Sequence, residues 1–155
     1  MKKINIFCFG FGQVAKSLIR KLYSEKYSFN LTTTTRQNTC EKKFEKIQYK
    51  CLQFDGDNFD IDIIEELKKA THILVSTPPE AEDYIIKNFS KYLENNHSLK
   101  WFGYLSSTGV YGNHDGAWVN EATLTDPTSE RGKKRLKAEL KFNNLNIPLI
   151  IFRLS

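Results

Sequence analysis

Cysteine is scarce in this 155-residue sequence, and its pattern excludes the sites that cysteines usually build. Three cysteines occur, an odd number, at Cys8, Cys40 and Cys51, and no C-x-x-C pair is present. This pattern argues against a disulfide framework and against a zinc site. We therefore expect reduced thiols, a cytoplasmic location and no metal site.

Long apolar stretches are also missing. No run approaches the roughly 20 apolar residues that a membrane-spanning helix needs. The first residues lead directly into a strand pattern and lack the apolar core of a signal peptide. We therefore expect no membrane partner.

The composition suits a globular protein of one domain, with 40% hydrophobic and 26% charged residues. The net charge is +5, but Lys and Arg are spread along the sequence. The basic run from Arg131 to Lys137 has no interleaved aromatic residues, so it favours the solvated face of a helix over a nucleic-acid platform. A basic surface also suits a phosphorylated cofactor, and we do not expect nucleic acid as a partner.

The first 22 residues carry a motif with a clear physical meaning. Residues 3 to 9 form a short apolar run typical of a buried strand, and the sequence Gly10-Phe11-Gly12-Gln13-Val14-Ala15 follows, a G-x-G-x-x-A pattern. The first glycine permits a tight turn, the second lets a pyrophosphate approach the backbone, and the small Ala15 lets the next helix pack closely. The motif predicts that residues 10 to 14 bind a dinucleotide at a helix start. The alternative is a turn that uses its glycines only for geometry.

The end of the second expected strand, 28–35, bears on which dinucleotide binds. Dinucleotide folds place an acidic residue there to bind the ribose of NAD, but Thr35, Arg36 and Gln37 include no carboxylate. An arginine suits the 2′-phosphate of NADP, so Arg36 predicts NADP over NAD, with an exposed loop arginine as the alternative. Asp55, after the third strand, either contacts the adenine or its ribose or is a turn aspartate.

Strand and helix patterns alternate along the whole sequence. Further strands are expected at 72–77, 101–106 and 147–154, and helices at 59–70, 80–93 and 129–143, while 38–46 is a loop or a short helix. Thr77 and Pro78, after the fourth strand, are expected to line the middle of the cofactor. In the last helix, Leu136 and Leu140 are expected to face inward. The alternation predicts an α/β protein, a Rossmann-like, doubly wound and mostly parallel sheet of about six strands.

A second signature follows the fifth strand, where residues 104 to 112 read YLSSTGVYG. This stretch resembles the S-S-x-x-V-Y-G segment of extended short-chain dehydrogenases/reductases, the NAD(P)-dependent epimerase/dehydratase family. Glu121, Pro127 and Ala138-Glu139 also stand where that family places Glu, Pro and Ala-Glu. Together with the glycine turn, the resemblance spans the chain. It implies an NAD(P)-binding domain over residues 1–155, similar to nucleoside-diphosphate-sugar epimerases, dehydratases and reductases that act on a small-molecule substrate.

The resemblance also implies catalytic residues, with one departure. Ser107, with Thr108 beside it, matches the position that binds the reacting oxygen of the substrate. Counting back from Ala138-Glu139, Arg131 and Arg135 stand at the places of the family's acid/base Tyr and of the Lys four residues later. A guanidinium stays protonated and cannot shuttle a proton near neutral pH. Arg131 is then an electrophile or anion clamp, Arg135 reaches a ribose or phosphate, and Tyr111 is the nearest alternative phenol.

This departure leaves a second hypothesis open, a catalytically inactive or truncated family remnant that acts as a nucleotide-binding or interaction module. Family members continue beyond the strand that corresponds to 147–154 into a region that defines the substrate, and that region is expected to be absent here. The 147–154 stretch is almost continuously apolar. An uncovered apolar edge strand invites association, so we expect self-association or binding of a partner fragment there.

Overall fold

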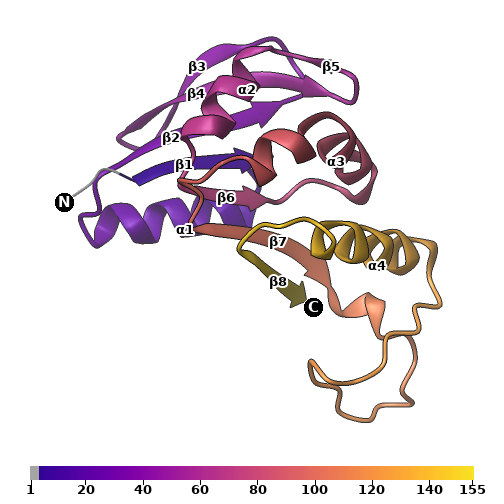
Figure 1. Ribbon diagram of the computed structural model, residues 1–155. Coiled ribbons are helices and arrows are strands. Elements are labelled where there is room, and N and C mark those ends of the chain that lie inside the picture. Colours follow the sequence, from indigo (N-terminus) through magenta and orange to yellow (C-terminus); the bar gives the residue numbers. More distant parts are fainter. Residues whose placement is uncertain (1–3) are drawn as a thin grey trace.

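The computed structural model describes residues 4 to 155 and shows the predicted alternation of strands and helices (Figure 1). The elements are β1 Ile4–Phe9, α1 Gln13–Ser24, β2 Phe29–Thr35, β3 Cys40–Phe44, β4 Ile47–Asp55, β5 Asn58–Phe59, α2 Asp62–Lys69, β6 His72–Val75, α3 Pro79–Glu94, β7 Trp101–Ser107, the 3₁₀ turn η1 Thr108–Val110, α4 Glu130–Asn143 and β8 Leu149–Leu154. Among these described residues, no helix is both long and apolar enough to cross a membrane.

The strands form one mixed sheet in the order β3-β4-β2-β1-β6-β7-β8, with β5 paired to β4. The pairs from β4 through β8 are parallel, and only β3 and β5 run antiparallel to β4. The predicted Rossmann-like, mostly parallel sheet is therefore confirmed. It has eight strands instead of about six, because β3 and β5 add to the predicted set.

The prediction of a loop or short helix at 38–46 was wrong. Residues 40–44 form β3, which joins β4 through a two-residue turn in which Glu45 has a φ of 55°. Most of β3 is exposed and charged, which is typical of an edge strand but gives no alternation of apolar and polar residues. Phe44 anchors the hairpin, because its ring meets that of Phe11 edge-on at 5.5 Å.

Helices cover both faces of the sheet, as Figure 1 shows, with α1 on one face and α2, α3 and α4 on the other. The larger core cluster lies under α2, α3 and α4 and includes Phe7, Phe9, Phe89 and Phe102. The smaller cluster lies under α1, where Cys8, Ala15 and Ile19 are fully buried.

The inward face of α4 differs from the prediction. Leu140 is 59% exposed, so its predicted inward position was wrong, and Leu136 is only partly buried. The buried face instead contains Arg135, Ala138, Glu139 and Phe142. Arg135 and Glu139 therefore lie on the buried face of α4, where the prediction had placed leucines. A search for apolar residues at helical spacing does not detect buried charged residues.

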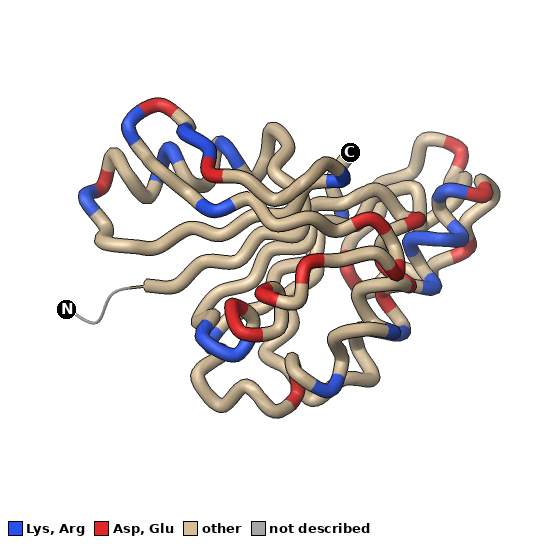
Figure 2. The backbone as a smooth tube through the Cα atoms, turned by 90° about the horizontal axis from the view of Figure 1, so that it is seen from above, with Lys and Arg blue, Asp and Glu red and all other residues tan. Residues whose placement is uncertain are grey.

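Charges of both signs mix on the surface. Figure 2 shows Lys and Arg lying among Asp and Glu instead of forming a field of one sign. The lysines of α4 lie beside carboxylates of α3, with Lys134 3.2 Å from Glu80 and Lys141 2.6 Å from Asp83. The basic run of α4 is thus partly neutralised by the neighbouring helix.

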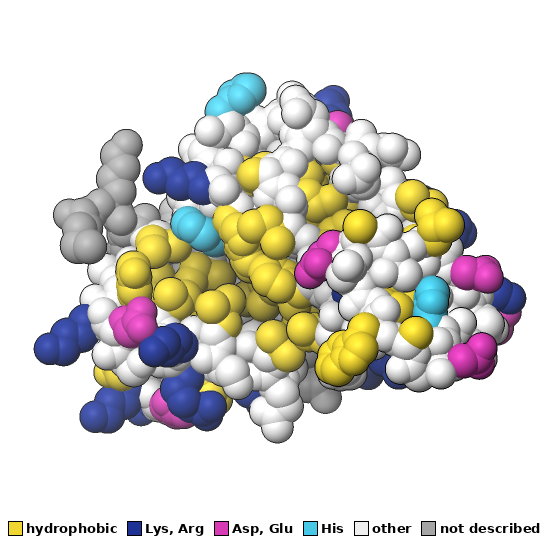
Figure 3. All heavy atoms as spheres, turned by 90° about the horizontal axis from the view of Figure 1, so that it is seen from below, with side chains coloured by type: hydrophobic (Ala, Val, Ile, Leu, Met, Phe, Trp, Pro, Cys, Tyr) yellow, Lys and Arg dark blue, Asp and Glu magenta, His cyan; other side chains and the backbone are white. Residues whose placement is uncertain are grey.

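The sheet face beside α1 is uncovered over β7 and β8. Along β8, Ile150, Phe152 and Leu154 are exposed while the alternate residues pack under α4, and the Phe152 and Trp101 rings lie 6.2 Å apart. Figure 3 shows hydrophobic side chains gathered in a hollow on this side of the molecule. The apolar sequence of β8 therefore serves one buried and one exposed face.

Candidate functional site

A groove of about 930 Å³ lies at the carboxyl ends of β1, β2, β4 and β6. Its lining includes seven residues that the sequence predicts to bind a cofactor, namely Gly10, Phe11, Gly12, Arg36, Asp55, Thr77 and Pro78. The remaining two, Gln13 and Val14, begin α1 directly after Gly12. In open α/β sheets, ligands bind outside the carboxyl ends of the strands, at the point where the strand order reverses.

The glycine turn is fixed between the ends of two strands. Gly10 has a φ of +79°, and its N–H donates to Oγ1 of Thr34 at 2.8 Å. The N–H of Ser76 donates to the carbonyl of Phe9 at 2.9 Å, and a Cβ on Gly10 would lie 3.3 Å from the Ser76 carbonyl oxygen. The turn therefore requires glycine at position 10, both for its φ and for space.

The start of α1 is open to an anion. Gly12 is the N-cap, no side chain of the described residues caps this helix, and its first turn carries no acidic residue. A Cβ on Gly12 would meet nothing within 4 Å, so the space in front of the helix is free. The unpaired N–H groups and the positive end of the helix dipole favour a negative group at this position.

Arg36 and Asp55 both line the groove, at the ends of the neighbouring strands β2 and β4. Arg36 is exposed directly after β2. Asp55 ends β4, pairs with Asn58 across a tight turn and lines the groove, so it is a turn residue that also faces the candidate site. Gly56 in that turn has a φ of +67° and lies against the ring of Tyr84.

The predicted catalytic residues do not line this groove. The Oγ of Ser107 accepts from the N–H of Gly109 at 3.1 Å and so caps η1, while Thr108 is exposed. Tyr111 is buried, and its hydroxyl accepts from Arg153 at 2.9 Å. Arg131 is exposed in the first turn of α4.

Arg135 points into the protein and is only 8% exposed. Its guanidinium binds the carboxylate of Glu82 and donates to the carbonyl of Thr77 at 3.2 Å and to the hydroxyl of Tyr104 at 3.3 Å. Burial raises the pKa of Glu82 to about 7, although the charge of Arg135 opposes the rise. Burial, followed by the charge of Glu82, also raises the pKa of Tyr104.

Sequence reasoning missed Glu82 in this cluster. A signal was present, because Glu82 stands three and seven residues before Ile85 and Phe89 on the inward face of α3. Its second carboxylate oxygen and the hydroxyl of Thr77 are buried without a hydrogen-bond partner among the described residues. Glu82 and Arg135 therefore link α3, α4 and the end of β6 behind the groove.

A second buried network joins β7, α4 and β8. Ser106 donates to Glu139 at 2.5 Å, and Arg153 donates to the same carboxylate with Nη2 at 2.7 Å and Nε at 3.1 Å. The hydrogen bonds to Glu139 raise the pKa of Arg153. This network fixes η1 and Tyr111 relative to α4. Of the ion pair between Arg153 and Glu139, the sequence analysis identified only Glu139, through the family resemblance.

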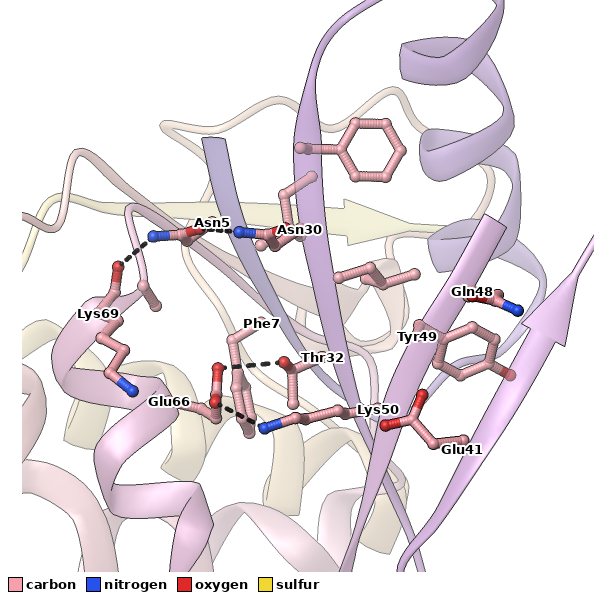
Figure 4. Close-up of a pocket in the computed structure, with 14 residues that line it drawn as sticks. Asn5, Phe7, Asn30, Thr32, Glu41, Gln48, Tyr49, Lys50, Glu66 and Lys69 are labelled. Atoms are coloured by element: carbon pink, nitrogen blue, oxygen red, sulfur yellow. Dashed lines mark hydrogen bonds and ion pairs between the residues drawn. The ribbon is translucent and has the colours of Figure 1, made fainter. Parts of the chain in front are cut away.

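Another groove, of about 500 Å³, lies at the opposite end of the strands (Figure 4). Asn5 donates to the carbonyl of Lys69 and accepts from Asn30, while Glu66 accepts from Thr32 at 3.3 Å. These polar groups bind one another, so they leave little for a ligand. No group of metal-ligating side chains occurs anywhere in the described part of the chain.

Comparison with known proteins supports the fold. No family model matches the chain, and no curated protein matches it. A functionally unknown conserved protein from Silicibacter pomeroyi DSS is 31% identical, with a TM-score of 0.77 over 99% of this chain and 52% of that one.

Two further solved structures are less similar in sequence. The UDP-glucuronic acid 4-epimerase from Bacillus cereus in complex with NAD is 17% identical, with a TM-score of 0.66 over 98% of this chain and 56% of that one. The dTDP-glucose 4,6-dehydratase from Bacillus anthracis in complex with NAD is 13% identical, with a TM-score of 0.69 over 97% and 54%.

The chain spans about half the length of these proteins. It has the fold of the NAD-dependent epimerases/dehydratases of the short-chain dehydrogenase/reductase type, which confirms at the level of the fold the resemblance seen in the sequence.

Proposed function

We propose that this protein binds a nicotinamide dinucleotide in the groove at the carboxyl ends of the strands, with NADP preferred over NAD. The observation that carries the proposal is the start of α1 after Gly12. No side chain among residues 4–155 caps it, and its unpaired backbone N–H groups face free space. The pyrophosphate lies there, and Gln13 and Val14 contribute backbone N–H groups. Structures of the same fold that contain NAD support the choice of ligand. A cytoplasmic location and one dinucleotide-binding domain over residues 1–155 belong to the same proposal.

The other groove residues then contact different parts of the dinucleotide. Arg36 binds the 2′-phosphate of NADP, Asp55 faces the adenine or its ribose, and Thr77 and Pro78 line the middle of the cofactor. Arg36 is exposed and lines the groove together with Asp55, which supports this arrangement.

Titration of NADPH and NADH, followed by their fluorescence, tests binding. We expect saturable binding in the wild type and its loss in Gly12→Val, because the valine side chain fills the approach of the pyrophosphate. The free space at Gly12 predicts that the unfolding midpoint of the ligand-free variant stays close to that of the wild type. Saturable binding retained in a folded Gly12→Val protein would contradict the proposed position, and no binding to the wild type at millimolar concentrations would contradict the function.

The preference for NADP is tested separately with Arg36→Ala. A hydrogen-bonded charge is worth about 1.5–3 kcal/mol, so we expect NADPH affinity to fall roughly tenfold or more while NADH affinity changes little. Lys46→Ala, which removes the same charge from the exposed β3–β4 turn, serves as the matched control. Equal loss of NADPH and NADH affinity in Arg36→Ala would reject the 2′-phosphate contact and leave dinucleotide binding intact.

We further propose that the chemistry resembles that of nucleoside-diphosphate-sugar epimerases, dehydratases and reductases. Ser107 and Thr108 bind the reacting oxygen of an unknown small-molecule substrate, Arg131 acts as an electrophile or anion clamp, and Tyr111 is the available phenol. Packing supports their proximity, because a Cβ on Gly132 would lie 2.5 Å from the carbonyl oxygen of Gly109. Arg135 acts from behind the groove, through the Thr77 carbonyl.

A catalytically inactive nucleotide-binding or interaction module is the second candidate. The internal hydrogen bonds of Arg135 favour it, as does the exposed apolar row of Ile150, Phe152 and Leu154. Such a patch is typical of an interface with a second copy or a partner fragment. Sedimentation of the 155-residue polypeptide at several concentrations tests it: a mass that rises with concentration supports association, and a constant monomer mass contradicts it.

A further inference from the structure

We propose that Cys40 and Cys51 are a redox-sensitive pair that closes a disulfide across the β3–β4 hairpin when a low-molecular-weight disulfide acts as the oxidant. The proposal goes beyond dinucleotide binding and does not depend on it. It assigns a modification site to two thiols that are free in the structure.

The strand register places the two cysteines directly opposite each other. Cys40 pairs with Cys51 in the antiparallel ladder, so both side chains lie on the same face of the sheet. Opposite residues in such a ladder have Cα atoms about 4.5 or 5.5 Å apart, and both values fall within the range of about 4.4–6.8 Å found in disulfides. The backbone is therefore already at a spacing that permits the bond.

Closing the bond requires a small movement that the hairpin allows. Cross-strand Cβ atoms lie about 4.5–5.5 Å apart, against about 3.5–4.5 Å in a disulfide. The required approach of up to about 1 Å falls on β3, an edge strand that, among the described residues, pairs only with β4 and is exposed from Cys40 to Lys43. A bond formed under such strain is readily reduced again.

The surroundings give the two sulfurs different roles. Cys40 is exposed and meets the oxidant, whereas Cys51 is buried and its Sγ accepts a hydrogen bond from the Thr33 hydroxyl at 3.3 Å. Tyr49 stands two residues before Cys51 on β4, so its side chain lies on the same face of the sheet as both thiols. Cys8 is fully buried on β1, and burial raises the pKa of its thiol to about 12, so it stays reduced.

The exchange balances in two steps. The Cys40 thiolate attacks the external disulfide, forms a mixed disulfide and releases one small thiol. The Cys51 thiolate then attacks the Cys40 sulfur, forms the Cys40–Cys51 bond and releases the second small thiol. The two cysteines lose two electrons and two protons, and the external disulfide gains both.

The test treats the folded 155-residue protein with oxidised glutathione, alkylates the remaining thiols in denaturant and maps tryptic peptides by mass spectrometry. We expect the loss of two alkylatable thiols, a linked pair of peptides that contain Cys40 and Cys51, and full alkylation of Cys8. Dithiothreitol should restore both thiols. The Cys8→Ala variant should form the same link, whereas Cys51→Ser should stop at a glutathione adduct on Cys40.

Two results would overturn the proposal. One is a glutathione adduct on Cys40 that persists in the wild type as it does in Cys51→Ser, which would show that Cys51 cannot reach it. The other is a link from Cys40 only to Cys8 or to a second molecule. Near-wild-type circular dichroism of Cys51→Ser confirms that the comparison is made between folded proteins.

Discussion

Replacing the buried Glu82 by glutamine should change how the stability of the protein depends on pH. The side chain of Glu82 is 1% exposed between α3 and α4, and its Oε2 has no hydrogen-bond partner among the described residues. Burial raises its pKa from the ordinary 4.5 to about 7, against the opposing charge of Arg135. Glutamine has nearly the same shape and carries no titrating proton, so Glu82→Gln removes the titration of this group together with its negative charge beside Arg135.

The size and sign of the effect follow from linkage. The folded state holds the proton of Glu82 up to about pH 7, whereas the unfolded chain releases it near pH 4.5. Stability from this group is therefore fully present below pH 4.5 and is lost as the pH rises through about 7. Since each pKa unit is worth about 1.4 kcal/mol, the wild type should lose roughly 3 kcal/mol that Glu82→Gln retains.

Urea unfolding followed by circular dichroism at pH 5, 6, 7 and 8 measures this difference. We expect the free energy of unfolding of Glu82→Gln, relative to the wild type, to increase from pH 5 through about pH 7 and to level off toward pH 8. Glu65→Gln is the control, because a hydrogen bond from Lys68 lowers the pKa of the exposed Glu65, so its contribution disappears only as the pH falls. A constant difference between Glu82→Gln and the wild type would refute the reasoning and show that Arg135 keeps Glu82 ionised throughout.

Two further predictions concern close approaches at glycine. Gly132→Ala should destabilise the protein by about 1–3 kcal/mol in urea unfolding, because its Cβ would lie 2.5 Å from the Gly109 carbonyl oxygen. Unchanged stability would mean that η1 can move away from α4 without cost. Gly103→Ala should displace the Trp101 ring, because the added Cβ would overlap it, and should shift the Trp101 fluorescence to longer wavelength in a Trp118→Phe background. An unshifted spectrum would contradict this position of the ring.

The sequence predicts the first strand, turn and helix well because their determinants are local. Gly10 takes the expected positive φ, Ala15 is fully buried, and Gly12 faces free space. The strand β3 was missed because its charged residues face solvent, and its partner β4, more than its own pattern, defines it as a strand. The glycine turn of this chain can therefore be predicted from its local sequence, whereas the edge strand β3 cannot.

The candidate site divides in the same way. Residues predicted from the glycine turn and from strand ends gather in one groove, since parallel strands bring their carboxyl ends to one edge. Glu82 and Arg153 were missed because their partners are distant in sequence: 53 residues separate Glu82 from Arg135, and 14 separate Arg153 from Glu139. Whether a charged residue is buried depends on such pairing, which composition and spacing do not encode.

The two outer strands of the sheet are unlike, and this difference limits how copies of the protein could assemble. The edge strand β3 presents Glu41, Lys42 and Lys43 to solvent, whereas β8 presents an apolar row on its exposed face and turns its only charge, Arg153, toward Glu139. A charged edge strand resists pairing with another sheet. If two copies met through β8, only charged edges would face outward, so growth would end at a closed dimer instead of continuing into a fibre.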